Sequence, residues 1–309
     1  MIEVNNLSKS FKRRVAKKGI KYQTIKAVDN ISLKIKKGEI YGLIGPNGAG
    51  KTTTLKILST LVIPDSGTVE INGFDLDRDA DKIRKSIGLL AGEFSRCLYW
   101  RLSGRENLKF FAKLNNIWKP DDRINDLVEL FQLQDYQNEL VMKYSTGMKH
   151  KLVLARGLLS DPPVLFLDEP LTGIDPITTY EIKKVVREHF KEKTIIWASH
   201  NLYEIEEMCD RIGVINQGKI VIEGEPEKLK RDYWDHSKLI VFCDKPESLS
   251  GIKNAIIKGE YVEISTKDVQ KTIEEILLIA KKENIQIKDI NTLKPSLEEI
   301  FMRGVKNDK

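Results

Sequence analysis

This sequence of 309 residues has few cysteines and no long apolar run, and each shortage excludes a class of protein. The three cysteines, Cys97, Cys209 and Cys243, lack the spacing of a metal site and the even count of a disulfide framework, which fits a reducing compartment. No apolar stretch approaches the roughly 18 residues that a membrane-spanning helix needs. The start, Met1–Val4, is not a basic segment followed by an apolar one, so we expect no secretory signal.

The overall composition is typical of a globular protein. Hydrophobic residues make up 41% of the chain and charged residues 31%, which argues against disorder, and the length allows one large domain and a small one. The net charge of +6 is modest, with a basic N-terminal region at Lys12–Arg14, Lys17–Lys18 and Lys34–Lys37. That region is a solvated face or a surface attracted to an anionic membrane leaflet. Nucleic-acid binding ranks last, because no recognition motif accompanies the charge.

A phosphate-binding loop lies near residue 50. The pattern G-x-x-x-x-G-K-[ST] follows the apolar segment Ile40–Ile44 and precedes a predicted helix over Thr53–Leu61, which is the context that this motif needs. Glycines let backbone N–H groups surround phosphate oxygens, and the helix N-terminus adds partial positive charge. We expect Lys51 to reach the β- and γ-phosphates and the Thr52 hydroxyl to ligate Mg²⁺. The predicted nucleotide-binding residues are Gly45, Pro46, Asn47, Gly48, Ala49, Gly50, Lys51, Thr52 and Thr53.

Two later apolar strands end in residues suited to hydrolysis. Val164–Leu167 leads into Asp168 and Glu169, and Thr194–Ala198 leads into a Ser-His pair that ends at His200. Ligands of nucleotide-binding sheets lie at the carboxyl ends of the strands. Asp168 is therefore predicted to hold Mg²⁺, directly or through water, and Glu169 to act as the general base toward the attacking water. The position of His200 favours a contact with the γ-phosphate.

Strand and helix patterns divide the chain. Met1–Asp75 is rich in strand signals, Ile83–Leu90 is predicted as a further strand, and about 93–160 is helical, with a capping box at Ser103–Glu106. From Val164 onward, strands alternate with helices. This alternation predicts a mainly parallel sheet flanked by helices.

A boundary near Gly224–Pro226 precedes a small α+β domain, predicted over 226–309. Strands are expected at Leu239–Cys243, Tyr261–Ile264 and Ile285–Ile290, and a final helix begins at Pro295. An amphipathic helix is predicted between the last two strands. The residues expected on its buried face are Val269, Ile273, Ile276, Leu277 and Ala280.

A third motif completes a recognisable set. Ser145, in the run Tyr144–Lys149, caps the apolar helix Leu152–Leu159, whose N-terminal N–H groups then point at an anion. The order of phosphate loop, Ser-x-Gly signature, hydrophobic-Asp-Glu, Gly-x-Asp and Ser-His over about Met1–Glu225 resembles the ATP-binding subunit of an ABC transporter. The resemblance implies an α/β fold of the P-loop NTPase class and ABC ATPase type. It has a mainly parallel core sheet, an antiparallel β subdomain and a helical subdomain at about 93–160.

In that family two copies pack head to tail, and each ATP lies between the phosphate loop of one copy and the signature of the other. The resemblance implies that Ser145 and Gly147 bind the γ-phosphate in trans, within a signature of Ser145, Thr146, Gly147 and Met148. It implies that Asp175 links the two sites across the dimer interface and that His200 is the switch histidine. The catalytic residues are then Glu169, His200 and Lys51.

The sequence departs from the family pattern at a few places and leaves one choice open. Phe11 is placed to stack on adenine, with Tyr22 as the alternative, because the segment between them is longer than the usual turn. Glu93 stands where the family has a glutamine that touches Mg²⁺, and its carboxylate is a candidate replacement. Thr146 stands where glycine is usual. The signature and a tail containing Lys-Pro-Ser-Leu-Glu-Glu-Ile-Phe resemble ATPases of drug, lipid or polysaccharide exporters of the daunorubicin-resistance type.

The resemblance implies an ATPase that powers export through a separate transmembrane partner, at the cytoplasmic face of the membrane. Its cofactors are ATP and Mg²⁺, and its partners are a second copy or a paired ABC ATPase and an integral membrane permease; no nucleic acid is expected. The permease would contact the region Glu93–Asn116. The apolar candidates for that contact, or for a plain core role, are Leu98, Tyr99, Trp100 and Leu102.

Two other functions stay open. One is a soluble ABC-type ATPase acting on ribosomes or DNA, which the single cassette and the absence of a sustained heptad pattern oppose. The other is a nucleotide-gated interaction module with little catalysis, suggested by the departure at Glu93. Four residues expected in catalysis argue against such a module: Lys51, Asp168, Glu169 and His200.

Overall fold

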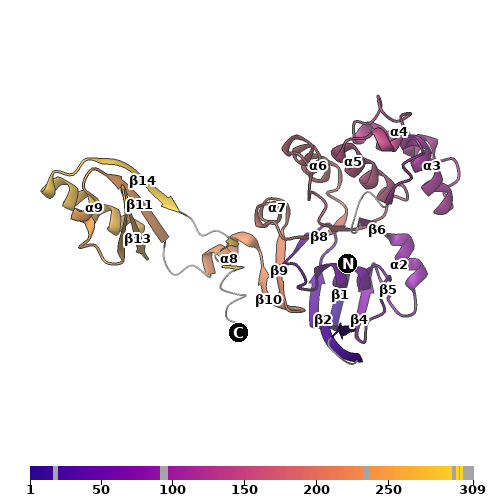
Figure 1. The fold of residues 1–309 in the computed structure, drawn as a ribbon, viewed down its shortest axis with the longest axis horizontal. Helices are drawn as coiled ribbons and strands as arrows, with labels where there is room; N and C mark the ends of the chain where they lie inside the picture. The colour runs from indigo at the N-terminus through magenta and orange to yellow at the C-terminus, as the bar shows by residue number, and fades with distance from the viewer. Residues whose placement is uncertain (17–19, 91–96, 233–236, 294–296, 299, 302–309) are drawn as a thin grey trace. The chain divides into compact units, whose positions relative to one another are not determined.

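The computed structural model describes residues 1–16, 20–90, 97–232, 237–293, 297–298 and 300–301. They fold into two compact units, one that ends at Glu225 and one that begins at Pro226 (Figure 1). The N-terminal unit holds two sheets and most of the helices, and the C-terminal unit holds a third sheet.

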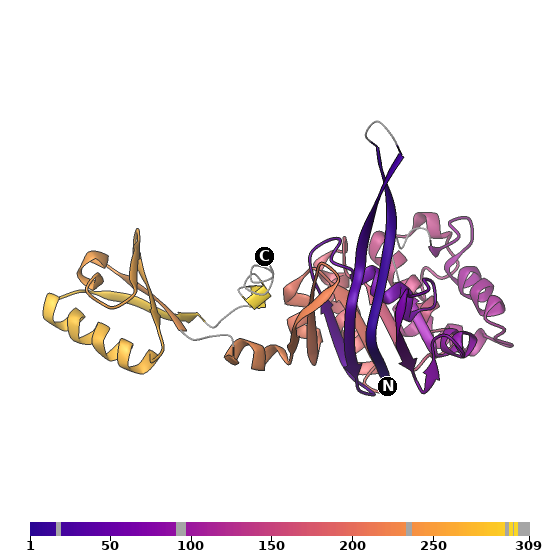
Figure 2. The same cartoon turned by 90° about the horizontal axis from the view of Figure 1, so that it is seen from below.

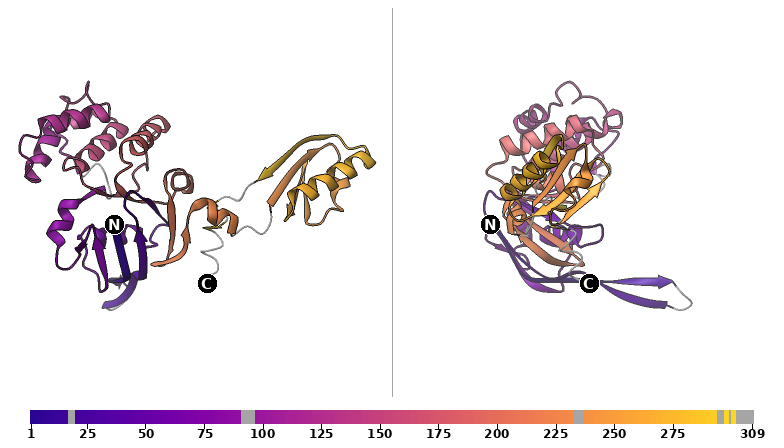
Figure 3. Two further views of the ribbon diagram at one scale, coloured as in Figure 1. Left: turned by 180° about the vertical axis from the view of Figure 1, so that it is seen from behind. Right: turned by 90° about the vertical axis from the view of Figure 1, so that its left-hand side faces the viewer.

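An antiparallel sheet of order β2-β1-β4-β5 forms one side of the N-terminal unit. The pairing of β1 with β4 ends at Ser8 opposite Ser66, whereas its pairing with β2 continues to Ala16 opposite Ile20. The outer half of this hairpin is therefore a two-stranded ribbon that projects from the unit (Figures 2 and 3). The strands are β1 (Ile2–Ala16), β2 (Ile20–Ile35), β4 (Ser66–Ile71) and β5 (Phe74–Asp75).

The core of the N-terminal unit is a six-stranded sheet of order β10-β9-β3-β8-β7-β6. All its neighbours run parallel except β10, which forms a hairpin with β9. Every residue of β7 and β8 is buried, which explains why these strands are continuous apolar runs. This arrangement confirms the predicted α/β fold. The strands are β3 (Ile40–Ile44), β6 (Ile87–Leu90), β7 (Val164–Asp168), β8 (Thr194–Ser199), β9 (Arg211–Asn216) and β10 (Lys219–Gly224).

Three helices of the N-terminal unit, α1, α6 and α7, follow parallel strands, α2 lies between β5 and β6, and the others gather in a helical region between β6 and β7. The predicted capping box is confirmed: Glu106 N donates to Ser103 Oγ at 3.2 Å, and Ser103 N donates to a Glu106 carboxylate oxygen at 2.7 Å. The helices are α1 (Lys51–Leu58), α2 (Ala80–Ser86), α3 (Gly104–Leu114), α4 (Asp121–Leu130), α5 (Thr146–Gly157), α6 (Pro176–His189) and α7 (Leu202–Met208), with a 3₁₀ turn at Val141–Lys143.

The strand predicted over Ile83–Leu90 is wrong in its first half. Residues up to Ser86 belong to α2, and the strand begins at Ile87. Ile83 is fully buried while its charged neighbours are exposed. A short helix with one buried apolar residue gives too little periodicity to be separated from the strand that comes after it.

The C-terminal unit packs one helix against an antiparallel sheet of order β12-β13-β11-β14. The helix α9 begins at an Asp268 cap and ends at Asn284, which has a φ of 53°. The predicted face is right for Ile276, which is fully buried, but wrong for Leu277, which is 52% exposed. The elements are α8 (Pro226–Asp232), β11 (Ser237–Cys243), a 3₁₀ turn (Pro246–Leu249), β12 (Ala255–Lys258), β13 (Tyr261–Thr266), α9 (Val269–Glu283) and β14 (Ile287–Leu293).

The two neighbouring residues of α9 offer a direct test of this packing. Ile276→Ala removes a buried side chain and is expected to lower the free energy of unfolding by about 2–5 kcal/mol. Leu277→Ala, the matched control, removes a half-exposed side chain and should change it by about 0.5 kcal/mol or less. Thermal unfolding of the full chain measures both. Equal effects of the two variants would contradict the observed orientation of α9.

Candidate nucleotide-binding site

The loop between β3 and α1 folds around the side chain of Lys51. The Lys51 ammonium donates to the carbonyl oxygens of Gly45 at 2.7 Å and Pro46 at 3.4 Å, and it lies 3.6 Å from a carboxylate oxygen of Glu169. Only 5% of Lys51 is exposed. The loop therefore presents a buried positive charge together with the N-terminus of α1, which is a combination that attracts phosphate.

Two glycines of this loop lie where any side chain would collide with backbone. A Cβ on Gly45 would be 2.3 Å from the carbonyl oxygen of Ile215, and one on Gly50 would be 2.3 Å from that of Ala27. Gly50 also has a φ of 117°. The turn after β9 braces the same loop, because Gly218 N donates to Ala49 O at 2.8 Å. The loop is thus held by strands on both sides.

Asp168 is the last residue of β7 and contacts the phosphate-binding loop. The Thr52 hydroxyl donates to Asp168 Oδ2 at 2.8 Å. The other oxygen, Oδ1, is buried and has no hydrogen-bond partner among the residues that the structure describes. Burial raises the pKa of the Asp168 carboxyl, opposed by the hydrogen bond from Thr52. An unpartnered buried carboxylate oxygen beside a hydroxyl suits a hard divalent cation.

Glu169 is the point at which the site residues meet. One carboxylate oxygen, Oε2, lies 2.8 Å from Nδ1 of His200 and accepts a hydrogen bond from the Thr172 hydroxyl at 3.1 Å, while Oε1 faces Lys51. The backbone of Glu169 has a φ of 53°, in the left-handed region, and its N–H donates to the carbonyl oxygen of Ala198 on β8 at 2.8 Å. Neighbouring strand ends therefore fix both the backbone and the carboxylate.

Two hydroxyl groups at this centre were missed by the sequence analysis. Thr172 contacts the Glu169 carboxylate directly, and Ser199 donates to it at 3.5 Å and to the buried Glu204 at 3.2 Å. Burial raises the pKa of Glu204. The sequence signal for the first of these contacts was the position of Thr172, three residues after Glu169 and just before Gly173, whose φ is 77°. A tight turn there returns the hydroxyl to the carboxylate.

The signature residues form a second group at the N-terminus of α5. Ser145 caps this helix by accepting a hydrogen bond from Met148 N at 3.1 Å. Gly147 lies against α6, where a Cβ would be 2.6 Å from the Thr178 hydroxyl. Asp175 caps α6, and hydrogen bonds from Thr178 lower the pKa of its carboxyl. Ser145, Thr146 and Asp175 are all exposed.

The structure brings some of the predicted residues together and not others. Lys51, Asp168, Glu169 and His200 form one contact group with Thr52, whereas the described residues show no hydrogen bond or ion pair between that group and the signature. The two residues predicted to stack on adenine lie on the projecting ribbon, where Phe11 is opposite Ile25 and Tyr22 is opposite Arg14. Glu93, predicted as a metal ligand, lies outside the described residues.

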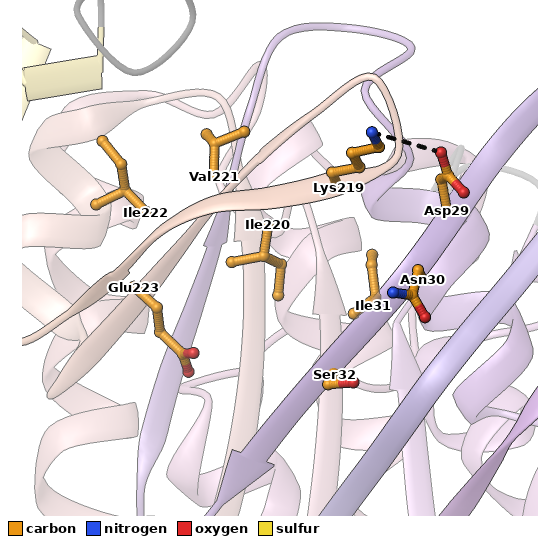
Figure 4. A pocket seen from close by; sticks show the side chains of 9 residues that line it. All are labelled: Asp29, Asn30, Ile31, Ser32, Lys219, Ile220, Val221, Ile222 and Glu223. Atoms are coloured by element: carbon orange, nitrogen blue, oxygen red, sulfur yellow. Dashed lines mark ion pairs between the residues drawn. The ribbon is translucent and has the colours of Figure 1, made fainter. Parts of the chain in front are cut away.

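A groove of about 580 Å³ lies beside this site and is distinct from it. It runs between β2 and β10, which are edge strands of the two sheets of the N-terminal unit (Figure 4). Lys219 and Asp29, 3.8 Å apart, mark one end of it. None of the loop residues Gly45–Thr52 lines the groove, so it is not the place for phosphates.

Comparison with known proteins fits this geometry. Residues 28–172 match the family model described as ABC transporter, and residues 224–305 match that of the C-terminal domain of DrrA1-3-like ATP-binding proteins. The chain is 31% identical over 299 residues to the daunorubicin resistance ATP-binding protein DrrA3 of Streptomyces coeruleorubidus, covering 94% of each protein. The chain belongs to the ABC transporter ATP-binding subunits. It is therefore an ATP-binding protein of an ATPase family.

Other relatives of this ABC ATPase agree. The bacitracin transport ATP-binding protein BcrA of Bacillus licheniformis is 40% identical over 212 residues, 68% of each protein. A solved dimeric bacterial ABC transporter cassette matches with a TM-score of 0.64 and 25% identity, over 73% of this chain and 98% of that one. These relatives do not favour an ATPase of ribosomes or DNA. Within the described part of the chain, no helix has the length and apolarity of a membrane span.

Replacing Asp168 with Asn is expected to stabilise the nucleotide-free ABC ATPase at neutral pH. Because burial raises the pKa of this carboxyl in the folded state, its ionisation costs stability as pH rises above the unfolded value. Asn removes that cost. The Tm should rise by a few degrees at about pH 7, the scale on which ~1 kcal/mol moves the Tm of such a domain. The difference should shrink as pH falls and disappear below the unfolded pKa of about 3.9, where the carboxyl is protonated in both states.

Asp161→Asn is the matched control, with the opposite sign. The hydrogen bond from Lys193 lowers the pKa of Asp161, so its ionised form stabilises the fold at neutral pH. That variant should have an unchanged or lower Tm. Calorimetry across the pH range measures both variants, and a Tm of Asp168→Asn below that of the wild type at neutral pH would contradict the argument.

Proposed function

We propose that this ABC ATPase powers export of a substrate through a separate transmembrane partner, with ATP hydrolysed at the centre around Glu169. The observation that carries the proposal is the contact of one carboxylate with both His200 and Lys51 at the ends of adjacent strands. A general base needs a fixed carboxylate next to the reacting phosphate. Glu169 has this property, because its backbone is tied to Ala198 and its side chain to Thr172.

In this proposal Lys51 binds the β- and γ-phosphates. In the structure its ammonium donates a hydrogen bond to the Gly45 carbonyl and faces Glu169. Phosphate oxygens supply stronger partners for the same cation. Glu169 Oε1 then faces the space next to the γ-phosphate, where it orients the attacking water and accepts its proton. His200, more than half exposed, remains within reach of both.

Thr52 and Asp168 are the proposed Mg²⁺ ligands. When bound, Mg²⁺ neutralises charge that develops on the phosphate oxygens. The unpartnered Oδ1 of Asp168 and the hydroxyl of Thr52 supply the oxygen ligands, directly or through water. Burial raises the pKa of the Asp168 carboxyl, and a bound cation would favour its ionised form.

A second copy is proposed to complete the site. Ser145 and Thr146, at the N-terminus of α5, are exposed, and no hydrogen bond or ion pair joins them to the phosphate loop among the described residues. An exposed helix N-terminus with a capping serine binds an anion, and the γ-phosphate of a facing copy fits it. Asp175, which caps the adjacent helix, is proposed to lie at the interface. The dimeric form of the related bacterial cassette supports this arrangement.

Export is proposed from the relatives. The names of DrrA3 and BcrA refer to daunorubicin resistance and bacitracin transport, and toxic compounds are removed by outward transport. The ATPase would act at the cytoplasmic face of the membrane, where its permease docks on the helical region. Tyr99 and Trp100 are half exposed there and suit such a contact, whereas Leu98 is buried and serves the core.

Glu169→Gln tests the base directly. The variant keeps the shape of the side chain but cannot accept the proton, so ATP binding should persist while turnover falls about 100-fold or more. Single-turnover hydrolysis and ATP titration measure the two separately. Glu188→Gln, an exposed residue of α6, is the control and should leave both unchanged. Near-normal turnover by Glu169→Gln would show that another group is the base.

Lys51→Ala tests the loop. It removes the buried cation that faces the phosphates, so ATP affinity should fall by about 100-fold or more, as expected for lost charge-assisted hydrogen bonds. Lys56→Ala removes an exposed cation from the same helix and should bind ATP like the wild type. Isothermal titration measures both. Unchanged affinity of Lys51→Ala would exclude this loop as the phosphate site.

A further inference from the structure

The positive charge of the chain is concentrated in one short segment. From Lys9 to Lys26 the sequence contains eight basic residues and no acidic one. The whole chain has 51 basic and 45 acidic residues, so 43 basic residues face 45 acidic ones in the remainder. The segment therefore carries more than the entire net charge of +6, and the rest of the protein is slightly negative.

The fold places the described residues of this segment, 9–16 and 20–26, on the projecting ribbon formed by β1 and β2 (Figures 2 and 3). At the base of the ribbon the cations have partners: Lys9 pairs with Asp65 at 2.7 Å, and Lys26 with Asp29 at 3.3 Å. Farther out, Lys12 is exposed and forms no ion pair within the described ranges. Lys12 thus lies beyond the ion pairs at the base of the ribbon.

Apolar side chains are interleaved with these cations. Phe11 is 42% exposed and Ile25 39% exposed, and the register places them opposite each other. Tyr22, 64% exposed, is opposite Arg14 nearer the tip. A two-stranded ribbon with both faces in water buries little apolar area and is only marginally stable. Exposed aromatic and aliphatic groups among cations are typical of surfaces that enter the headgroup region of a membrane.

We propose that this ribbon binds the anionic phospholipid surface of the membrane next to the permease. The proposal rests on the proposed function, which places the ATPase at that surface. Clusters of basic residues are attracted to anionic lipids by about 1 kcal/mol for each Lys or Arg. Lipid is favoured over nucleic acid because the apolar side chains among the cations gain a place to be buried in the headgroup region.

The test is sedimentation of the full chain with vesicles of phosphatidylcholine containing about 30% phosphatidylserine, in about 0.1 M salt. A variant with Lys12, Arg13, Arg14 and Lys21 replaced by Thr removes half the charge and keeps strand-forming residues. Its partition coefficient should fall about 100-fold or more. Wild-type binding should also be lost on pure phosphatidylcholine and at about 0.5 M salt.

The matched control removes four exposed cations from the C-terminal unit by changing Lys253, Lys271, Lys281 and Lys282 to Gln. It should bind vesicles like the wild type. An equal loss of vesicle binding in both variants would show that binding depends only on net charge, and it would overturn the proposal. So would failure of the wild type to bind the anionic vesicles, including the case in which it binds single-stranded RNA instead. ATP titration of the same preparations tests the nucleotide site separately, so the failure of one proposal is distinguishable from that of the other.

Discussion

The geometry of the site depends on the burial of the Lys51 ammonium. A cation removed from water is costly unless its protons are satisfied. Here the loop turns back so that the Gly45 carbonyl accepts one hydrogen bond, and Glu169 approaches from the end of β7, two strands away from β3 in the sheet. The turn is possible only because the loop backbone passes against Ile215 and Ala27 at positions that hold glycine. The charge, the glycines and the carboxylate therefore form one unit.

The parallel sheet brings the reacting groups to one edge. In the order β3-β8-β7, Ile44 pairs with Ser199 and Asp168 with Ala198, so the strands end at the same level. The phosphate loop, Glu169 and His200 come directly after these ends and are therefore neighbours in space. The hydrogen bond from Glu169 N to Ala198 O joins two of the ends beyond the ladder. This bond supports the left-handed backbone of Glu169, which by itself is strained.

The fold class and the contact group around Lys51 could be predicted from motifs whose spacing reflects short-range geometry. The strand, the glycine loop and the helix together restrict the position of Lys51. An acid that directly follows a buried strand lies at the carboxyl end of that strand. Thr172 and Ser199 were missed because their contacts depend on how a turn closes, which single residues do not determine. Leu277 was misplaced since both it and Ile276 are apolar, and only the tertiary packing of α9 decides which is buried. The length of the β1–β2 ribbon was missed because no apolar alternation marks strands that lack a third neighbour.

A site divided between two chains changes what ATP accomplishes. If the phosphates were enclosed by one chain, binding would stabilise that chain and leave its partner unaffected. In the proposed arrangement the same γ-phosphate satisfies Lys51 of one copy and the α5 N-terminus of the other, where Ser145 is exposed. ATP then binds the closed pair more tightly than the open one, and only such a difference in affinity can shift a conformational equilibrium. Cleavage of the γ-phosphate removes the shared anion and with it the preference for closure. In this arrangement, hydrolysis at Glu169 of one copy leads to the separation of the two copies.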